Sequence, residues 1–179
     1  MNLKAITAFF YHQKYIWAVI IIPLFFSACG YRFSGSGNLP GGIQTIAIEI
    51  FENRTPETGL ENTITNGLIY EFTRKGRSVQ KNSKQADAVL TGVIASERIT
   101  TISRQAQQSP LARRVEIIVN LKLTGSGGGV KWSASGVSEF QEYNVATDKQ
   151  ATEINKRQAI ETLSKKLAEK VYNRLTEDF

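Results

Sequence analysis

The sequence feature that most constrains the fold is the pattern of residues 113–124, in which apolar side chains recur at every second position from Val115 to Leu123. A period of two is typical of a β-strand that buries one face and exposes the other. The buried face would carry Val115, Ile117, Val119, Leu121 and Leu123. The opposite face would carry Arg114, Glu116, Ile118, Asn120, Lys122 and Thr124. This strand is therefore expected in a sheet that is covered on one side only.

Two further segments with a strand-like pattern, residues 86–102 and 130–143, flank it in the chain. The residues expected to share one side of the second segment are Trp132, Ala134 and Phe140. The glycine-rich tract 125–129 is interpreted as a hairpin turn, because it lacks the Lys-Ser/Thr ending of a phosphate-binding loop. At about 3.3 Å per residue such strands reach about 40 Å, so the hairpin ends are expected to project beyond the compact core.

The segments before these strands predict another strand and a helix. Residues 43–51 are rich in β-branched side chains at a period of two, and a turn over residues 52–56 ends this strand. A helix is expected over residues 58–75, with Thr58 and Glu61 as a capping box. Its buried stripe recurs every four residues and consists of Leu60, Ile64, Leu68 and Phe72.

Gly76 is expected to end this helix, and residues 78–85 are expected to form a polar loop. The last segment, residues 148–176, predicts a long amphipathic helix with Glu161 and Lys165 on its solvated side. The residues predicted for its inward stripe are Ile160, Leu163, Leu167, Ala168, Val171, Tyr172 and Leu175. Both helices therefore have a single apolar face.

The predicted order of elements is β-α-β-β-β-α, which indicates an α+β fold. A crossover through a helix sets the first two strands parallel, and the strands that follow form an antiparallel meander. Two helices with one apolar stripe each can cover only one face of a four-stranded sheet. We therefore expect a two-layer sandwich, a four-stranded mixed sheet with both helices on one face and a relatively polar opposite face.

The N-terminal segment, residues 1–28, predicts a bacterial lipoprotein signal peptide. It carries two lysines, then an apolar run over residues 15–26, then the small pair Ser27-Ala28 that a signal peptidase requires. The apolar run is shorter than the roughly 20 residues of a transmembrane helix. Cys29, the only cysteine of the chain, follows directly.

Cys29 resembles the lipidated cysteine of a bacterial lipobox, with Phe26 at the position that usually holds Leu. The resemblance implies that Cys29 becomes an acylated N-terminus that anchors the protein stably. Gly30 follows it where Asp would retain a lipoprotein in the inner membrane, which implies the periplasmic face of the outer membrane. Residues 29–42 would then be a lipidated tether and residues 43–179 a single domain. The alternative is a core cysteine at an ordinary signal-peptide junction.

Composition excludes several classes of function. The only histidine, His12, lies in the predicted signal, so the mature chain has no imidazole, and its one thiol is Cys29. Ser-His-Asp and Cys-His catalysis, His/Cys zinc sites and redox pairs are thereby excluded, and we expect no enzyme, no metal and no cofactor. Loss of residues 1–28 lowers the formal net charge from +6 to +4. An exported protein meets no nucleic acid, so this excess would face lipopolysaccharide phosphates, anionic lipid or an acidic protein, or only water.

Several short motifs of the mature chain recur together in one family. They are Gly30-Tyr31-Arg32-Phe33 after the cysteine, the Ile-rich strand, Phe51-Glu52-Asn53-Arg54-Thr55, Gly59-Leu60-Glu61 at the helix start, and the long C-terminal helix. With these motifs the chain resembles the LptE family of lipopolysaccharide-assembly lipoproteins. The resemblance implies a domain that plugs the lumen of the outer-membrane barrel LptD, helps this barrel to assemble, and binds lipopolysaccharide during its delivery to the cell surface.

The resemblance also implies which residues contact lipid A. Family members place basic residues between the second and third predicted strands and near the start of the last helix, and the matching positions are Arg104 and Lys149. Arg113 and Arg114 lie close to the same loop, in a stretch without acidic residues. Guanidinium groups suit bidentate phosphate binding. The alternative is that these side chains are merely solvated.

Two other functions remain open at this point. A strand that ends in Phe-x-Asn-x-Thr before a helix also resembles outer-membrane lipoproteins that activate peptidoglycan synthases or act in curli-type secretion. A carboxylate-dependent periplasmic hydrolase is a third interpretation, although no pair of Asp or Glu residues stands out in the sequence. The partner that co-purifies with the protein in mild detergent would separate these alternatives.

Overall fold

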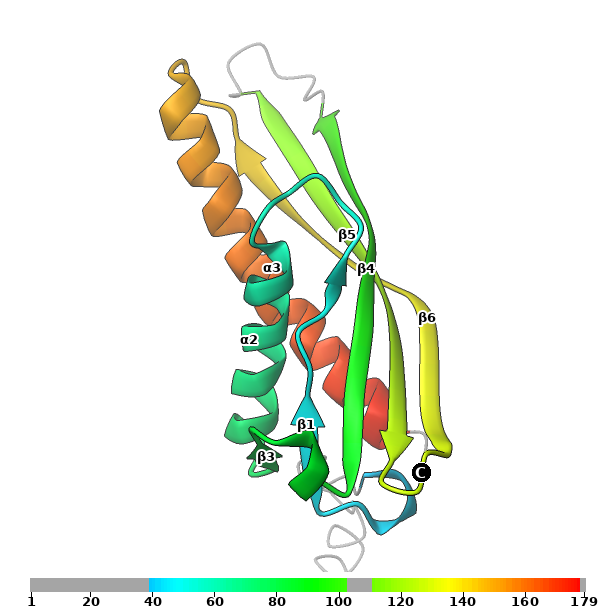
Figure 1. The fold of residues 1–179 in the computed structure, drawn as a ribbon. Coiled ribbons are helices and arrows are strands. Elements are labelled where there is room, and N and C mark those ends of the chain that lie inside the picture. The colour runs from blue at the N-terminus through cyan, green and yellow to red at the C-terminus, as the bar shows by residue number, and fades with distance from the viewer. Residues whose placement is uncertain (1–38, 103–110, 178–179) are drawn as a thin grey trace, which may run out of the picture. The chain divides into compact units, whose positions relative to one another are not determined.

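A computed structural model describes residues 39–102 and 111–177, which form an α+β domain with one sheet and two long helices. Both helices pack against one face of the sheet and share a single core with it (Figure 1). The predicted α+β sandwich is therefore confirmed. The predicted signal peptide, Cys29, most of the tether and the loop over residues 103–110 lie outside the described residues.

The sheet has six strands rather than the four predicted, in the order β3-β1-β4-β5-β6, with β2 paired to β4. The strands are β1 (Thr45–Ile48), β2 (Glu52–Asn53), β3 (Ser78–Gln80), β4 (Ala88–Ile102), β5 (Ala112–Gly125) and β6 (Val130–Asn144). The two additional strands, β2 and β3, are too short to show an alternating pattern. Residues 78–85, predicted as a polar loop, contain β3 and a 3₁₀ turn over Ser83–Gln85.

The pairing of the strands follows the prediction. β1 runs parallel to both β3 and β4, whereas β4, β5 and β6 form an antiparallel meander. Across the meander Leu123 lies opposite Leu90 on one side and Trp132 on the other. The apolar residues predicted for the inner face of β5 are all buried beneath the helices.

A β-bulge in β6 changes which residues face the helices. Val119 pairs with Val137 and Leu121 with Ala134, so β6 contains one residue more than β5 between these pairs. Gly136 lies in the bulge with φ 67°, and its backbone N–H donates to Asn120 Oδ1 over 2.8 Å. The extra residue inverts the alternation beyond it. Trp132 and Ala134 therefore share one side, but Phe140 lies on the open side and is 44% exposed, so its predicted placement was wrong.

Helix α2 (Leu60–Arg74) begins differently from the prediction. Its N-cap is Gly59, with φ 87° and no capping side chain, so the predicted capping box of Thr58 and Glu61 does not form. The carboxylate of Glu61 instead accepts a hydrogen bond from Asn53. The predicted end is confirmed: Gly76 takes φ 76°, a left-handed conformation that suits glycine, and its backbone N–H donates to the carbonyl of Thr73.

Helix α3 (Lys149–Glu177) crosses the sheet obliquely and packs mainly on β6 and α2 (Figure 1). The side chain of Asp148 caps its first turn, because its carboxylate accepts the backbone N–H groups of Gln150 and Ala151. Every residue predicted for its inward stripe is buried. Where α3 crosses α2, a Cβ atom on Gly67 would overlap Ser164 Oγ, so a side chain at Gly67 would force the two helices apart.

The N-terminal part of the described chain packs into the same core. Leu39 is 2% exposed, and it precedes a short 3₁₀ turn over Pro40–Gly42 that lies against β6. Phe51, after β1, stacks its ring directly over Gly92 of β4, where a Cβ atom would overlap the ring. In the described ranges, 39–102 and 111–177, no helix is both long and apolar enough to cross a membrane.

Candidate functional site

The predicted lipopolysaccharide-binding residues in the described chain gather at one end of the domain. We call it the far end: β4 ends at Ile102, β5 begins at Ala112, β6 ends at Asn144, and α3 begins at Lys149 (Figure 1). The hairpin of β4 and β5 does not project alone, because the first turns of α3 accompany it. Arg104 lies in the loop outside the described residues.

Arg114 lies on the open face of the sheet and is engaged within it. Its guanidinium stacks on the Phe140 ring with 4.2 Å between the guanidinium carbon and the ring centroid. One terminal nitrogen donates to Glu142 Oε1 over 2.9 Å. The Nε atom is buried and has no acceptor among the described residues, whereas the side chain as a whole is 42% exposed. Arg114 is thus held in a defined orientation, and only the exposed part of its guanidinium can meet a ligand.

Arg113 points to the other face. Neighbouring residues of a strand project to opposite sides of a sheet, so Arg113 lies on the helix-covered face while Arg114 lies on the open face. The cross-strand partners of Arg113 are Thr101 and Tyr143, and its side chain is half-buried. The two arginines therefore lie on opposite faces of the sheet at the start of β5 and do not form a single patch.

Lys149 is the first residue of α3 and is exposed. Its backbone lies next to Asp148, the capping residue, and the peptide N–H groups of this first turn carry the positive end of the helix dipole. Lys149 and the two arginines therefore contribute positive charge to the same end of the domain from two different elements.

A groove of about 250 Å³ opens at this end between β6 and α3. Its lining is dominated by amide and carboxylate side chains: Gln141, Glu142, Asn144, Asn155 and Gln158, with Thr162 at the helix side. Two of these amides are already used. Asn155 Nδ2 donates to the carbonyl of Asn144 over 2.9 Å, and Gln141 accepts from Lys166 and donates to the carbonyl of Glu142. Amides and hydroxyls can bind sugar hydroxyls and phosphate oxygens. The sequence did not reveal this groove, because two separate elements supply its walls.

A buried charge cluster lies under the far half of the sheet. Lys156 Nζ of α3 lies 2.6 Å from Glu57 Oε2 and 3.2 Å from Glu97 Oε1, and the Lys156 and Glu97 side chains are only 12% and 6% exposed. Burial acts to lower the pKa of Lys156, but the hydrogen bonds with Glu57 and Glu97 outweigh burial and hold this pKa above its ordinary value. The cluster ties α3 to β4 and to the turn before α2, and sequence reasoning missed it.

The motif Phe51-Glu52-Asn53-Arg54-Thr55 has a structural role in the fold. Asn53 Oδ1 accepts hydrogen bonds from both the backbone N–H and the hydroxyl of Thr55. Its Nδ2 atom donates to the carbonyl of Glu57 and to Glu61, each over 2.8 Å. One side chain thus fixes the turn between β2 and α2 and the entry into the helix. The motif therefore marks a fold rather than a binding site.

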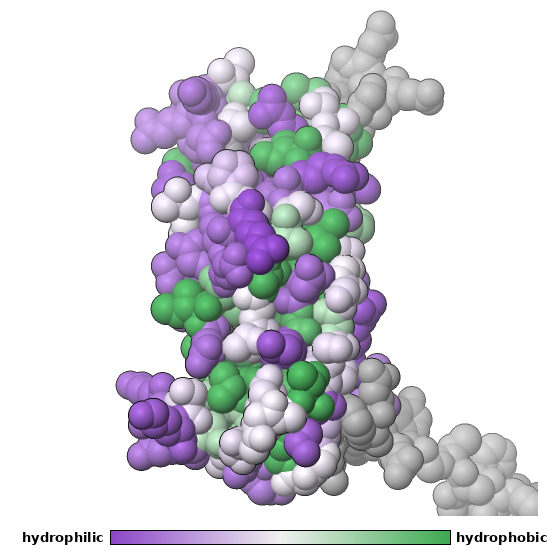
Figure 2. All heavy atoms as spheres, turned by 45° about the vertical axis from the view of Figure 1, so that its right-hand side comes forward, coloured by the Kyte–Doolittle hydropathy of each residue, from purple (hydrophilic) through white to green (hydrophobic). Residues whose placement is uncertain are grey.

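The open face of the sheet is mixed in character. Figure 2 shows apolar side chains scattered among polar ones on the view it presents. The pattern of β5 accounts for this, because its outward residues include Arg114, Glu116, Asn120 and Lys122 beside Ile118. Within the part of the chain that the structure describes, no three His, Cys, Asp or Glu side chains are placed to bind a metal ion.

Comparison with known proteins gives a family match and several similar folds. The model of a lipopolysaccharide-assembly family, LptE, matches residues 43–175. No curated protein is similar enough in sequence to count as a relative.

Among solved structures, the uncharacterized lipoprotein B from Nitrosomonas europaea is similar at 12% identity, with a TM-score of 0.54 and coverage of 78% of this chain and 85% of that one. A minor lipoprotein from Acinetobacter baumannii is similar at 9% identity, with a TM-score of 0.50 and coverage of 75% and 92%. At these identities the likeness concerns the fold alone.

Proposed function

The chain belongs to the LptE family of lipopolysaccharide-assembly proteins, and we propose that it is an outer-membrane lipoprotein that plugs and helps to assemble an LptD-type barrel. In this role it binds lipopolysaccharide on the way to the cell surface and catalyses no reaction. The observation that carries the proposal is the extent of the family match, which spans both helices and every strand of the domain.

The geometry of the sheet supports the role of a plug. The lumen of an outer-membrane barrel is polar, so a protein that fills it needs a polar outer surface and a core of its own. Here both helices bury their apolar stripes on one side of the sheet, and the open side presents charged and amide side chains interspersed with apolar ones. The domain can therefore enter a polar lumen without exposing its core.

The lipopolysaccharide contact is proposed at the far end. Lys149, Arg113 and Arg114 bring positive charge to this end, and Arg104 of the adjoining loop would add another guanidinium. Charge-assisted hydrogen bonds to phosphate are among the stronger polar contacts in proteins. The amide-lined groove between β6 and α3 lies beside Arg114's partner Glu142 and could receive sugar hydroxyls next to the phosphates.

The anchor is proposed at Cys29. Mass spectrometry of the mature protein from membranes should find an acylated cysteine at the N-terminus, and Cys29→Ser should release the protein unless a partner retains it. An unmodified Cys29 at the N-terminus, or cleavage at another position, contradicts the anchor and leaves the proposed partner untouched.

Co-purification in mild detergent tests the proposed partner. The tagged protein should bring down an outer-membrane barrel in stoichiometric amount, and this complex should retain lipopolysaccharide. Capture of a peptidoglycan synthase or of a curli-type secretion pore in place of the barrel would favour the alternative role that the Phe-x-Asn-x-Thr motif left open. A variant with Leu167→Asp serves as the unfolded control, since an intact domain is required in either case.

A further inference from the structure

The end of the domain opposite the far end is closed by a dense set of hydrogen bonds. We call it the tether end, since the described chain begins there at Leu39. Asp87, just before β4, accepts the backbone N–H groups of Gln44 and Thr45 over 3.0 and 2.8 Å. Its carbonyl accepts the N–H of Ser126, the first residue of the glycine-rich turn between β5 and β6. The starts of β1, β4 and β6 therefore meet at this end.

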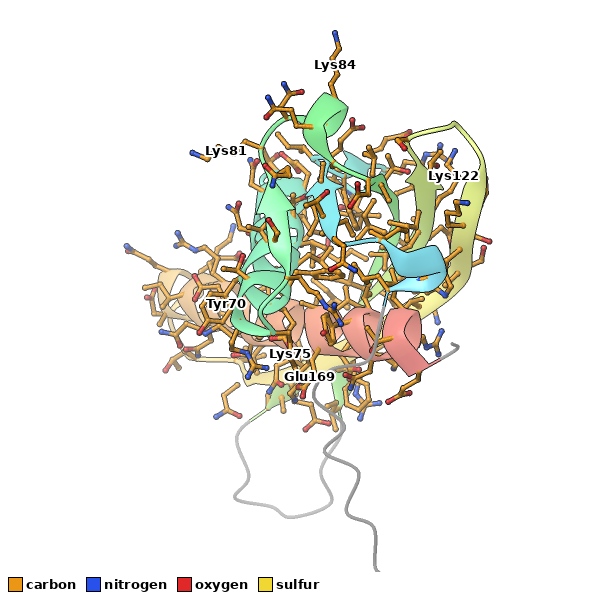
Figure 3. The ribbon with its side chains drawn as sticks, turned by 90° about the horizontal axis from the view of Figure 1, so that it is seen from below. Tyr70, Lys75, Lys81, Lys84, Lys122 and Glu169 are labelled. Carbon is orange, nitrogen blue, oxygen red and sulfur yellow. The ribbon has the colours of Figure 1, made fainter. Side chains whose placement is uncertain are left out.

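A basic segment belongs to the tether end. Between Glu71 and Asp87 the chain contains no acidic residue, and the basic residues of this interval are Arg74, Lys75, Arg77, Lys81 and Lys84. They follow the end of α2 and run through β3 to the 3₁₀ turn before β4. Figure 3 looks onto this end and shows Lys81 and Lys84 extending outward from it.

Two of these lysines have no ion-pair partner among the residues that the structure describes. Arg74 is paired with Glu71 over 2.8 Å, and Lys75 lies 5.4 Å from the centre of the Tyr172 ring. Lys81 and Lys84 are exposed and form no ion pair with any residue in the ranges 39–102 and 111–177. Their charge is therefore available to a ligand outside the domain.

The acidic groups near this segment offset only part of its charge. The Asp87 carboxylate accepts two backbone N–H groups, which hold its pKa below the ordinary value and keep it ionised, so it supplies one negative charge. Glu71 is buried and paired with Arg74. The negative charge of Glu169 on α3 also helps to hold the pKa of Arg74 above its ordinary value. The neighbouring turn, Gly125–Gly129, carries no charged residue at all. A positive surface thus remains around Lys81 and Lys84.

The position of the tether relates this surface to a membrane. Leu39, which is packed into the core at this end, lies ten positions after Cys29. At no more than about 3.5 Å per residue, such a segment spans at most about 35 Å. If Cys29 carries the acyl chains, as the proposed function requires, the tether end can lie no farther than this from the bilayer surface.

We propose that the tether end faces the membrane and that Lys81 and Lys84 bind the phosphates of anionic phospholipid headgroups. The lipid anchor keeps the protein at the membrane, while the lysines set which end of the domain faces it. Each lysine near an anionic surface contributes about a fivefold gain in binding. The contact is electrostatic, so it weakens as salt shortens the screening length.

Binding to vesicles tests the proposal without barrel, lipopolysaccharide or acyl chain. The chain from residue 29 onward, carrying Cys29→Ser, is sedimented at low ionic strength with vesicles of phosphatidylcholine alone or with added phosphatidylglycerol. We expect binding only to the anionic vesicles. Lys81→Gln combined with Lys84→Gln should lower the partition coefficient about 25-fold. The matched control, Arg157→Gln with Lys165→Gln, removes two exposed charges from α3 and should lower it less than threefold.

Each outcome decides the proposal. Equal losses in the two double variants, or no binding of the parent to anionic vesicles, would overturn it. The proposal would also be overturned if inorganic phosphate releases more protein from the anionic vesicles than chloride does at equal ionic strength. Such a result would indicate a site for free phosphate and not a lipid-binding surface. Acylation of Cys29 is measured separately by mass spectrometry, so failure of the anchor and failure of the surface remain distinguishable.

Discussion

The two ends of the domain differ in how most of their basic side chains are held. At the far end Arg114 is held by Glu142 and Phe140, and Lys156 lies between Glu57 and Glu97, while Lys149 is exposed. At the tether end Lys81 and Lys84 are held by nothing in the described chain. The difference teaches that net charge alone does not identify a binding surface, because a paired cation mainly shapes the protein whereas an unpaired one can meet a partner.

The polarity of the interior also changes between the tether end and the far end. Near the tether end the sheet meets the helices through hydrocarbon, with Leu90, Leu123 and Trp132 in one row across the meander. Toward the far end Ile117 has Glu97 and Glu139 as its cross-strand neighbours, and both carboxylates pair with lysines of α3. Between sheet and helices, the far half therefore contains ion pairs where the row near the tether end is apolar.

The largest effect is expected from charges placed in the hydrocarbon half. Leu68→Asp and Leu167→Asp each bury a carboxylate without a partner and should lower the free energy of unfolding by several kcal/mol, enough to unfold a marginal domain. Lys166→Asp, on the outside of α3, loses one exposed hydrogen bond to Gln141 and should change little. Thermal denaturation checks this prediction. Equal shifts in melting temperature for the three variants would mean that the helical faces are wrongly assigned.

An intermediate effect is expected at the buried cluster. Lys156→Met leaves Glu57 and Glu97 without their cation and should lower the free energy of unfolding by about 2–3 kcal/mol. Because folding raises the pKa of Lys156, the parent holds this stabilisation below the ordinary lysine value of 10.5 and loses it as the pH rises through the raised value. The difference in stability between parent and Lys156→Met should therefore shrink in strong alkali. Exposed Lys165→Met is the control and should differ little from the parent at any pH. A stability difference between parent and Lys156→Met that stays constant with pH would contradict the role of the cluster.

The smallest effect is expected on the open face. Phe140→Ser removes one half of the stacking with Arg114 and should lower the free energy of unfolding by about 0.5–1 kcal/mol. Val137→Ser, three residues earlier but fully buried, should lower it by about 2 kcal/mol or more. Urea unfolding of the two variants tests the bulge at Gly136 directly. A larger loss for Phe140→Ser would place Phe140 in the core, as the uninterrupted alternation had predicted.

The helices and long strands could be predicted because their patterns repeat many times. The stripe of Leu60, Ile64, Leu68 and Phe72 fixes which face of α2 is buried, and every second residue of β5 from Val115 to Leu123 is apolar and buried. The bulge at Gly136 could not be foreseen from the pattern, since a single glycine within a strand is compatible with either register. β2 and β3 were missed because two or three residues carry no periodicity, and their pairing depends on β4 and β1.

The candidate site was predictable in its residue types but not in its arrangement. Arg113, Arg114 and Lys149 stood out as basic residues near one loop and one helix start, and they do lie at one end. That Arg114 already pairs with Glu142, and that Glu57, Glu97 and Lys156 meet beneath it, depends on contacts between residues far apart in the chain. Such contacts leave no local signal in one sequence.

The affinity for lipopolysaccharide, compared between variants of the two ends, tests the central claim most directly. Replacing Arg104, Arg113 and Arg114 by Ser removes charge-assisted contacts of about 1.5–3 kcal/mol each and should weaken lipopolysaccharide binding at least tenfold. Lys81→Gln with Lys84→Gln should leave it within about twofold, with Trp132 fluorescence confirming that both variants are folded. Retained binding in the arginine variant, or an equal loss in the lysine variant, would contradict the assignment of the far end to lipopolysaccharide.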